Sequence, residues 1–271
     1  MKIDCLIFSK DRACQLDLLL RSIKDNFEEI HPIILFKQTN ENYKLGYEKV
    51  NSYHSGYEWI EEESFVPDLR KIVSTFRNQF FLVLVDDEIV IRDYPIKNAM
   101  YALELNNDLH CVSLRMNPSI HYTYTADLAS PPPTFFDDYR FDDLLFWNWE
   151  NYDGRTDWGY PSCINSHIYR KEFIIPMIQN LPFNNVNRLE GLLNLQRSSF
   201  KKQMACFNKS KTINIANNLI QTGTNRHSNN PEYSVENLNR KFLEGNRIST
   251  ENFYNYDNNL ATLERDYIWL K

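Results

Sequence analysis

The chain has 271 residues, of which 42% are hydrophobic and 24% charged, so it fits one large α/β domain or two small domains. This composition lies in the globular range and excludes disorder, a coiled coil or a collagen-like fibre as a description of the whole chain. The formal net charge of −6 argues against a broad basic surface, so nucleic acid is not an expected partner.

The amino-terminal sequence does not favour export or membrane insertion. Asp4 interrupts the short apolar run at the start of the chain, so no secretory signal is expected. The longest apolar runs, such as Phe80–Val85, fall far short of the ~18 residues of a membrane helix. Five scattered cysteines without a C-x-x-C pair favour reduced thiols over a disulfide framework or a zinc site. We therefore expect a cytoplasmic protein without a transmembrane segment.

Strand and helix patterns alternate in the first part of the chain. A short apolar run predicts a strand at Ile3–Phe8, and apolar residues spaced i, i+3, i+4 and i+7 from Leu16 to Ile23 predict a helix after it. Further strands are predicted at 32–36, 80–85 and 109–116, and helices at 69–76 and 96–103. Strands that alternate with helices in this way predict a parallel sheet covered on both faces.

The second half of the chain follows a less regular pattern. Residues 117–160 contain three consecutive prolines and many aromatic side chains, a composition too apolar for a solvated linker. We interpret them as an insertion that folds over the sheet and supplies a wall of a pocket. Later strands are predicted at 163–170, 203–207 and 212–215, and later helices at 171–179, 189–193 and 234–243.

Three consecutive carboxylates, Asp86, Asp87 and Glu88, follow the most apolar predicted strand. Carboxylates this close raise one another's pKa unless a cation neutralises them. Mg²⁺ commonly takes one or two protein carboxylates and completes its shell with water and phosphate oxygens. Ligands of parallel sheets bind beyond the carboxyl ends of the strands, so we expect the polar cluster after the first strand to face the same ligand. The triplet favours a metal–diphosphate site, and a solvated acidic turn is the alternative.

Three segments carry a resemblance to a known family: IFSKDRACQLDLLLRSI at the amino terminus, FFLVLVDDEIVIRD in the middle and WGYPSCINSHIYRKEFI later. Together they resemble the GT-A-fold glycosyltransferases, in particular the family-2-like group that uses nucleotide sugars. The resemblance implies a Rossmann-like α/β fold with a mostly parallel central sheet flanked by helices, an aromatic-rich insertion and a helical C-terminal tail. It implies a glycosyltransferase domain over 1–245, with a donor-binding half over 1–116 and an acceptor-binding half over 117–245, followed by an extension over 246–271.

The resemblance also implies an activity and a donor site. The activity is transfer of a sugar from a nucleoside-diphosphate sugar, with UDP favoured, to a hydroxyl group of a glycan or glycolipid acceptor. Asp86, Asp87 and Glu88 match the family's D-x-D motif, which binds Mn²⁺ or Mg²⁺, and His227 matches a late histidine that serves as a further metal ligand. Asp86 and Asp87 are also assigned to the donor. The remaining donor-binding residues are Ser9, Lys10, Asp11 and Arg12.

Glu190 matches the acidic general base of family members that invert the anomeric carbon, and the implied mechanism is direct displacement. A general base of this kind contributes about 10²- to 10⁴-fold to the rate. A glutamate favoured by the dipole at the start of a helix is the alternative for this position. Four residues are assigned to the acceptor side: Trp158, Tyr160, His167 and Arg170.

Two other functions stay open at this point. A nucleotidyltransferase acting on sugar phosphates also joins an α/β sheet to carboxylate-bound metal, although the chain has no glycine-rich phosphate loop. A non-catalytic carbohydrate-binding module could use the aromatic insertion, but it would leave the acidic triplet without a purpose. The surplus of aromatic residues also leaves room for a homodimer contact or a peripheral membrane contact.

Overall fold

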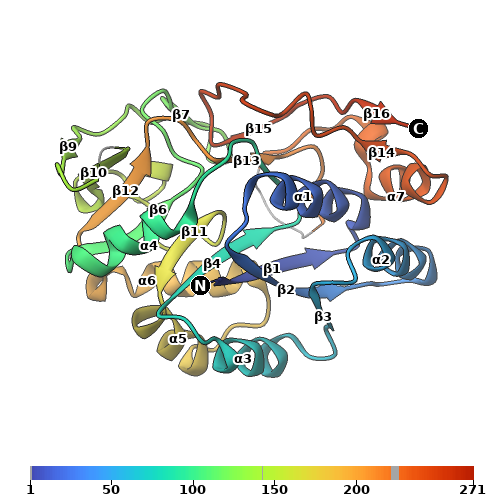
Figure 1. Cartoon of the computed structure of the whole chain (residues 1–271), viewed down its shortest axis with the longest axis horizontal. Coiled ribbons are helices and arrows are strands. Elements are labelled where there is room, and N and C mark those ends of the chain that lie inside the picture. Colours follow the sequence, from blue (N-terminus) through green and yellow to red (C-terminus); the bar gives the residue numbers. More distant parts are fainter. Residues whose placement is uncertain (1, 142, 221–225) are drawn as a thin grey trace.

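A large sheet organises the chain (Figure 1). The computed structural model describes residues 2–141, 143–220 and 226–271, and within them this sheet has nine strands in the order β3-β2-β1-β4-β11-β6-β12-β10-β9. The strands are β1 (Ile3–Lys10), β2 (Ile30–Lys37), β3 (Glu58–Glu61), β4 (Phe80–Val85), β6 (Leu109–Ser113), β9 (Phe136–Asp137), β10 (Leu144–Asn148), β11 (His167–Arg170) and β12 (Gln203–Phe207).

Most strands of this sheet run in one direction. β3, β2, β1 and β4 pair in parallel, and β12 pairs in parallel with β6. β11 lies antiparallel between β4 and β6, so β4 and β6 point the same way. The carboxyl ends of β1, β4, β6 and β12 therefore meet at one edge of the sheet. The predicted α/β fold with a mostly parallel central sheet is confirmed.

The core consists of two apolar clusters, one on each face of the sheet. On β1, Ile3, Cys5 and Ile7 join one cluster while Leu6 and Phe8 join the other, as the two-residue period of a strand requires. One face is covered by α1 (Ala13–Asn26), α2 (Glu41–Tyr53) and α4 (Ile96–Leu105), and the other by α3 (Phe65–Thr75), α5 (Lys171–Asn180) and α6 (Val186–Leu195). Helices thus cover both faces, as predicted.

A smaller three-stranded sheet lies beyond the carboxyl end of β4. Its order is β15-β13-β5, and its strands are β5 (Glu88–Val90), β13 (Thr212–Ile215) and β15 (Thr262–Leu263). Other short elements are β7 (Tyr122–Thr123), β8 (Leu128–Ala129) and the 3₁₀ turns η1 (Trp149–Asn151), η2 (Asp157–Gly159), η3 (Arg197–Ser199) and η4 (Pro231–Tyr233). No helix within the described ranges combines the length and the apolar character needed to span a bilayer.

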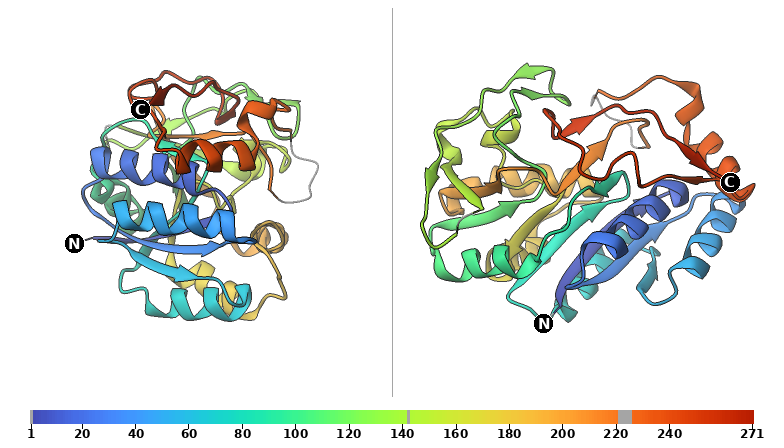
Figure 2. Two further views of the ribbon diagram at one scale, coloured as in Figure 1. Left: turned by 90° about the vertical axis from the view of Figure 1, so that its right-hand side faces the viewer. Right: turned by 45° about the horizontal axis from the view of Figure 1, so that its top comes forward.

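Residues 246–271, called the C-terminal segment below, correct the prediction of a helical tail. The helix predicted at 234–243 forms just before this segment, but the segment itself contains short strands and no helix. Its strands pair with each other or with β13, and its side chains Phe253 and Tyr267 join the apolar cluster beside α1, which is why it does not coil into a helix. Figures 1 and 2 show the segment in red, lying along the sheet on the side of α1. The elements are α7 (Val235–Leu243), β14 (Arg247–Ile248), β15 and β16 (Trp269–Leu270).

Asp17 joins three parts of the chain inside the protein. Its carboxylate on α1 accepts hydrogen bonds from Arg21 Nε at 3.0 Å and Arg247 Nε at 2.9 Å, and His54 Nε2 lies 3.0 Å from its Oδ1. Burial opposes ionisation of Asp17, but hydrogen bonds from His54 and Arg247 outweigh burial and lower its pKa to about 2. This buried network fastens the end of α2 and the strand β14 to α1.

Replacing Asp17 should destabilise the fold. We expect Asp17→Asn to lower the free energy of unfolding at pH 7 by about 3 kcal/mol, because the arginines lose their charged partner in the interior. The folded-state pKa lies below the unfolded value of 3.8, so the wild-type advantage is present at neutral pH and is lost as the pH falls from about 4 toward 2. Urea unfolding at pH 7 and pH 3 measures both effects, and equal stabilities at pH 7 would contradict the role of the network.

Candidate functional site

Three charged side chains meet where β1 and β4 end side by side. The register pairs Phe8 with Val85, so the loops that follow these residues face each other. Arg12 Nη1 donates hydrogen bonds to Asp86 Oδ1 at 3.0 Å and to Asp87 Oδ2 at 2.7 Å. The side chains of Asp86 and Asp87 are only 6% and 16% exposed, so solvent screens this ion bridge weakly. The structure therefore brings Arg12 and both aspartates together, as the sequence predicted.

The end of β1 and the loop that follows it are shaped around Asp86. Ser9 Oγ and the amide of Lys10 both donate to Asp86 Oδ2, at 2.9 and 3.0 Å. Asp11 has a φ of 56°, a left-handed conformation that aspartate tolerates better than most residues. Its carboxylate accepts hydrogen bonds from the amide and hydroxyl of Thr39 and so ties this loop to the end of β2. Of the four predicted donor residues in the loop, Ser9, Lys10 and Arg12 contact Asp86, and Asp11 faces β2 instead.

Asp86 and Asp87 differ in how much of their charge is already compensated. Burial raises the pKa of Asp86 to about 6, against the opposing effect of Arg12, and its two oxygens accept three hydrogen bonds. Within the described part of the chain, each oxygen of Asp87 accepts one hydrogen bond, Oδ2 from Arg12 and Oδ1 from Asn214 Nδ2 at 2.6 Å. Asp87 is thus the more exposed carboxylate and keeps a lone pair on each oxygen. The three side chains together carry a net charge of −1 when both aspartates are ionised.

Glu88 does not join the two aspartates. It begins β5, where successive side chains point to opposite sides, and it is fully buried. Its Oε1 accepts from Ser166 Oγ at 2.5 Å and its Oε2 from the amide of Val85 at 2.9 Å. Burial raises the pKa of Glu88 to about 8, so it is mostly protonated at neutral pH. Both oxygens of Glu88 are therefore hydrogen-bonded inside the protein, away from the proposed metal ion.

The metal set predicted from the sequence is not assembled. Among residues 2–141, 143–220 and 226–271, no three His, Cys, Asp or Glu side chains are arranged to hold a metal ion. His227 is partly buried after β13 and belongs to no such group. The physical reason is the inward turn of Glu88 and the hydrogen bonds that already occupy Asp86. Asp87 keeps a lone pair on both oxygens, whereas Asp86, the less exposed of the two, keeps one on Oδ1.

A second group of polar side chains surrounds Glu190 in α6. Asn185 caps this helix by accepting from the amide of Arg188 at 2.8 Å, which fixes its start near the loop before β11. Glu190 is partly buried, and the nearby Cys163 thiol and Ile164 amide favour its ionised form. Burial raises the pKa of Glu190 to about 7, although nearby positive charge opposes the rise. A carboxylate with this pKa can exchange a proton at neutral pH.

Arg115 connects the two groups. It follows β6 at the carboxyl edge, is buried, and lies within electrostatic range of Glu190. Its Nη1 donates to Thr262 Oγ1 at 3.3 Å, and Thr262 on β15 pairs with Asn214 on β13. Since Asn214 binds Asp87, an unbroken series of contacts runs from the aspartate pair to the surroundings of Glu190. The two groups are therefore linked through Asn214, Thr262 and Arg115.

Only one of the four predicted acceptor residues lies in this site. Tyr160 is partly buried, and burial and the charge of Glu190 both raise its pKa. Trp158 is fully buried, packs edge-to-face on Trp147 and donates its Nε1 proton to a main-chain carbonyl, so no ring face is open to a sugar. This part of the aromatic insertion builds core rather than a pocket wall.

Arg170 is not brought to the site, and His167, although within electrostatic range of Arg115, is buried. His167 is buried on β11, and burial lowers its pKa to about 3. Arg170 pairs in register with Phe80, where β4 begins, so it lies at the opposite edge of the sheet from Asp86. It binds main-chain carbonyls there, including that of Asn106 at 3.0 Å. Arg170 lies at that edge because β11 runs antiparallel to β4.

Three residues of the site were missed from the sequence: Arg115, Asn214 and Thr262. The strand predicted at 109–116 ends at Ser113, so Arg115 follows a strand at the carboxyl edge and the rule that found Asp86 also applies to it. Asn214 and Thr262 have no local signal, because their role depends on the pairing of β13 with β15.

Comparison with known proteins gives one curated relative. No family model matches the chain. The bifunctional glycosyltransferase pgtA of Dictyostelium discoideum is 29% identical over 227 residues, which is 74% of this chain and 29% of that protein. The chain is similar to a glycosyltransferase. It spans less than a third of the length of that relative, and the resemblance predicted from the sequence motifs is confirmed at this level.

Solved structures give weaker similarities. They include the mannosyltransferase PcManGT from Pyrobaculum calidifontis in complex with GDP-Man and Mn²⁺, with a TM-score of 0.42 and 8% identity over 77% of this chain and 55% of that chain. The bifunctional IspDF from Campylobacter jejuni has a TM-score of 0.39 and 12% identity over 77% of this chain and 50% of that chain. CMP:2-keto-3-deoxy-manno-octonic acid synthetase complexed with CTP has a TM-score of 0.39 and 13% identity over 78% of this chain and 91% of that chain. Similarities at this level carry no conclusion about function.

Glu88→Gln tests the buried protonated carboxyl. The folded-state pKa of about 8 lies above the unfolded value of 4.5, so the contribution of Glu88 to stability is present at low pH and is lost as the pH rises through 8. We expect the wild type to lose stability relative to Glu88→Gln between pH 5 and pH 9, since glutamine stays neutral. Urea unfolding of both proteins measures the difference, and a difference independent of pH would contradict the protonated state.

Proposed function

We propose that the chain is a glycosyltransferase domain that moves a sugar from a nucleoside-diphosphate sugar to a hydroxyl group of a glycan or glycolipid, with inversion at the anomeric carbon. One observation supports this proposal: contacts through Asn214, Thr262 and Arg115 link the Arg12–Asp86–Asp87 bridge to the surroundings of Glu190, whose pKa is about 7. The similarity to pgtA supports the same class of reaction.

The donor is proposed to lie against the loop after β1 and the acidic loop after β4, both within residues 1–116. Arg12 offers the positive charge that a diphosphate needs, and Ser9 and Lys10 hold Asp86 in place beside it. The acceptor is proposed to lie against residues 117–245, where Tyr160 flanks Glu190. Inversion requires the leaving group and the base on opposite sides of the sugar, and the proposed division assigns them to different halves of the chain.

Asp87 is proposed to hold a divalent cation, Mn²⁺ or Mg²⁺, together with the donor, and UDP is the proposed nucleotide. The donor set fits such an ion, because each Asp87 oxygen keeps a lone pair and hard cations prefer carboxylate oxygens. The net charge of −1 around Arg12 also leaves a diphosphate without sufficient positive partners. When bound, the cation would neutralise charge on the diphosphate leaving group.

Glu190 is proposed to act as the general base. It takes the proton of the acceptor hydroxyl as that oxygen forms a bond to the anomeric carbon. The bond between the anomeric carbon and the diphosphate oxygen breaks at the same time, and the diphosphate leaves with the electron pair. A pKa of about 7 suits this role, because the carboxylate is ionised in a large fraction of molecules at neutral pH and still attracts a proton.

Nucleotide binding tests the donor site. We expect UDP with Mn²⁺ to raise the melting temperature of the wild type, since a ligand that binds only the folded state stabilises it. Asp87→Asn should remove this rise because it removes the proposed cation ligand, and the neighbouring Glu88→Gln should keep it. Differential scanning fluorimetry of the three proteins makes the comparison. A rise that survives in Asp87→Asn, or none with any nucleoside diphosphate, would count against the site.

Transfer kinetics test the base. We expect Glu190→Gln to lower kcat by about 10²- to 10⁴-fold and to leave the thermal shift with UDP and Mn²⁺ unchanged. In the wild type, kcat should fall as the pH drops below about 7, since protonated Glu190 cannot accept a proton. The assay measures nucleoside diphosphate released from a panel of nucleotide sugars, and water serves as the acceptor when no glycan is supplied. Unchanged turnover in Glu190→Gln would remove it as the base. In a parallel assay with a nucleoside triphosphate and a sugar phosphate, release of pyrophosphate would identify nucleotidyl transfer instead.

A further inference from the structure

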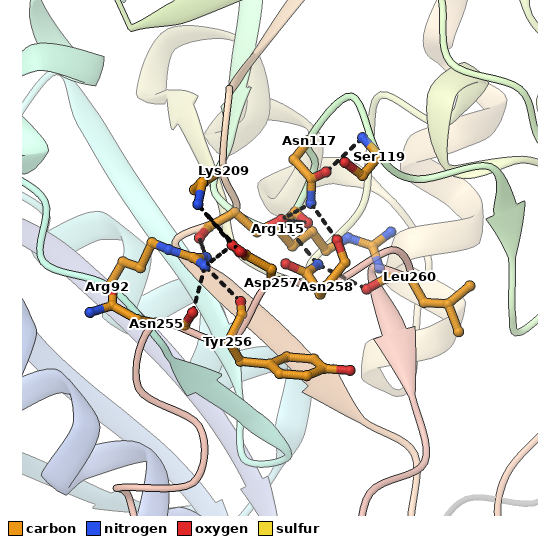
Figure 3. A network of polar contacts seen from close by, with 11 residues as sticks. Arg92, Arg115, Asn117, Ser119, Lys209, Asn255, Tyr256, Asp257, Asn258 and Leu260 are labelled. Atoms are coloured by element: carbon orange, nitrogen blue, oxygen red, sulfur yellow. Dashed lines mark hydrogen bonds and ion pairs between the residues drawn. The ribbon is translucent and has the colours of Figure 1, made fainter.

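Arg92 fastens the C-terminal segment to the sheet. This side chain follows β5 and is 7% exposed. It donates hydrogen bonds to the carbonyls of Ser210, Asn255 and Tyr256 and pairs with Asp257 at 2.6 Å (Figure 3). A buried guanidinium with this many main-chain acceptors fixes the path of the backbone that supplies them. The chain that leads into β15 is therefore held in one position.

The same network holds the backbone at Arg115. Asn117 Nδ2 donates to Ser210 Oγ at 2.7 Å and to the carbonyl of Asn258 at 3.1 Å, and Asn258 Nδ2 donates to the carbonyl of Leu260 at 2.9 Å (Figure 3). Ser210 Oγ donates in turn to the carbonyl of Arg115 at 2.7 Å. The C-terminal segment and the end of β6 are thus fixed relative to each other.

Thr262 is the residue of the C-terminal segment that reaches the site. It is 5% exposed and lies on β15, in register with Asn214 of β13. Its Oγ1 accepts the hydrogen bond from Arg115 Nη1. The second terminal nitrogen of Arg115, Nη2, donates to Asp157 Oδ1 at 2.5 Å. Within the described residues the Nε of Arg115 is buried without a hydrogen-bond partner, so Thr262 and Asp157 alone orient the guanidinium.

The charge held in this way lies within electrostatic range of Glu190. Around Glu190 lie Arg115 from the end of β6, Asp157 and Tyr160 at η2, and Cys163 before β11. Among these neighbours Arg115 is the cation, and it favours the ionised form of Glu190 against the effect of burial. Arg115 also has Glu88 within electrostatic range, so a guanidinium released from Thr262 has other carboxyl groups to turn toward.

We infer that Thr262 is a positioning residue for the proposed reaction: by accepting the Nη1 hydrogen bond it fixes, together with Asp157, the orientation of the Arg115 guanidinium that acts on Glu190. The C-terminal segment then contributes a residue that affects the reaction. This inference rests on the proposed role of Glu190 as the general base.

A matched pair of variants tests the inference in the full chain. Thr262→Val keeps the branched shape and loses the acceptor, whereas Thr262→Ser keeps the hydroxyl. We expect the titration midpoint of the Glu190 carboxyl to rise by about half a pH unit or more in Thr262→Val, because the favourable charge is no longer held beside it. The midpoint in Thr262→Ser should stay at the wild-type value. Carbon-13 NMR titration of glutamate-labelled protein measures it, with Glu190→Gln identifying the resonance.

Kinetics provide the second readout. The acidic limb of the kcat profile should move upward by the same amount in Thr262→Val, with the KM for the donor unchanged. A wild-type midpoint in Thr262→Val, or equal shifts in both variants, would overturn the inference, and Thr262→Ala replaces valine if that variant does not fold. The NMR titration needs no substrate, so a wild type that lacks transfer activity refutes the proposed function separately from this result.

Discussion

The ion bridge from Arg12 to Asp86 and Asp87 is the interaction on which the rest of the site depends. Two adjacent carboxylates at the end of a buried strand repel each other unless positive charge is held between them. Parallel pairing of β1 with β4 supplies that charge, because it places the residue after one strand opposite the residues after the other. The bridge also compensates only one of the two negative charges, which leaves Asp87 suited to a cation that arrives with a diphosphate.

The sequence carried much of this arrangement in local patterns. The apolar run Phe80–Val85 predicted a strand buried on both faces, and the rule for parallel sheets then directed attention to Arg12 and Asp86 at its edge. Glu190 could be singled out through the family resemblance, and its polar surroundings became visible in the structure. Local patterns could not predict the direction in which a strand runs. Arg170 lies at the far edge because β11 runs antiparallel to β4, and long-range pairing decides that direction.

Burial was the second quantity that residue type did not reveal. Trp158 is a residue that often stacks on sugars, yet here it fills the core beside Trp147. Glu88 continues an acidic run, yet the alternation of β5 turns it inward, where it is protonated. Thr262 shows the converse, since an unremarked threonine near the end of the chain reaches Arg115 through strand pairing alone. Each case depends on contacts between distant segments, which a single sequence does not display.

The most direct measurement of the central claim is a crystal structure of the full chain with UDP and Mn²⁺. The account predicts the metal ion on Asp87, the diphosphate beside it and Arg12, and the nucleoside against the loop after β1, with the sugar position open toward Glu190. A nucleotide bound elsewhere on the protein, or one whose diphosphate lies away from Asp87 and Arg12, would contradict it.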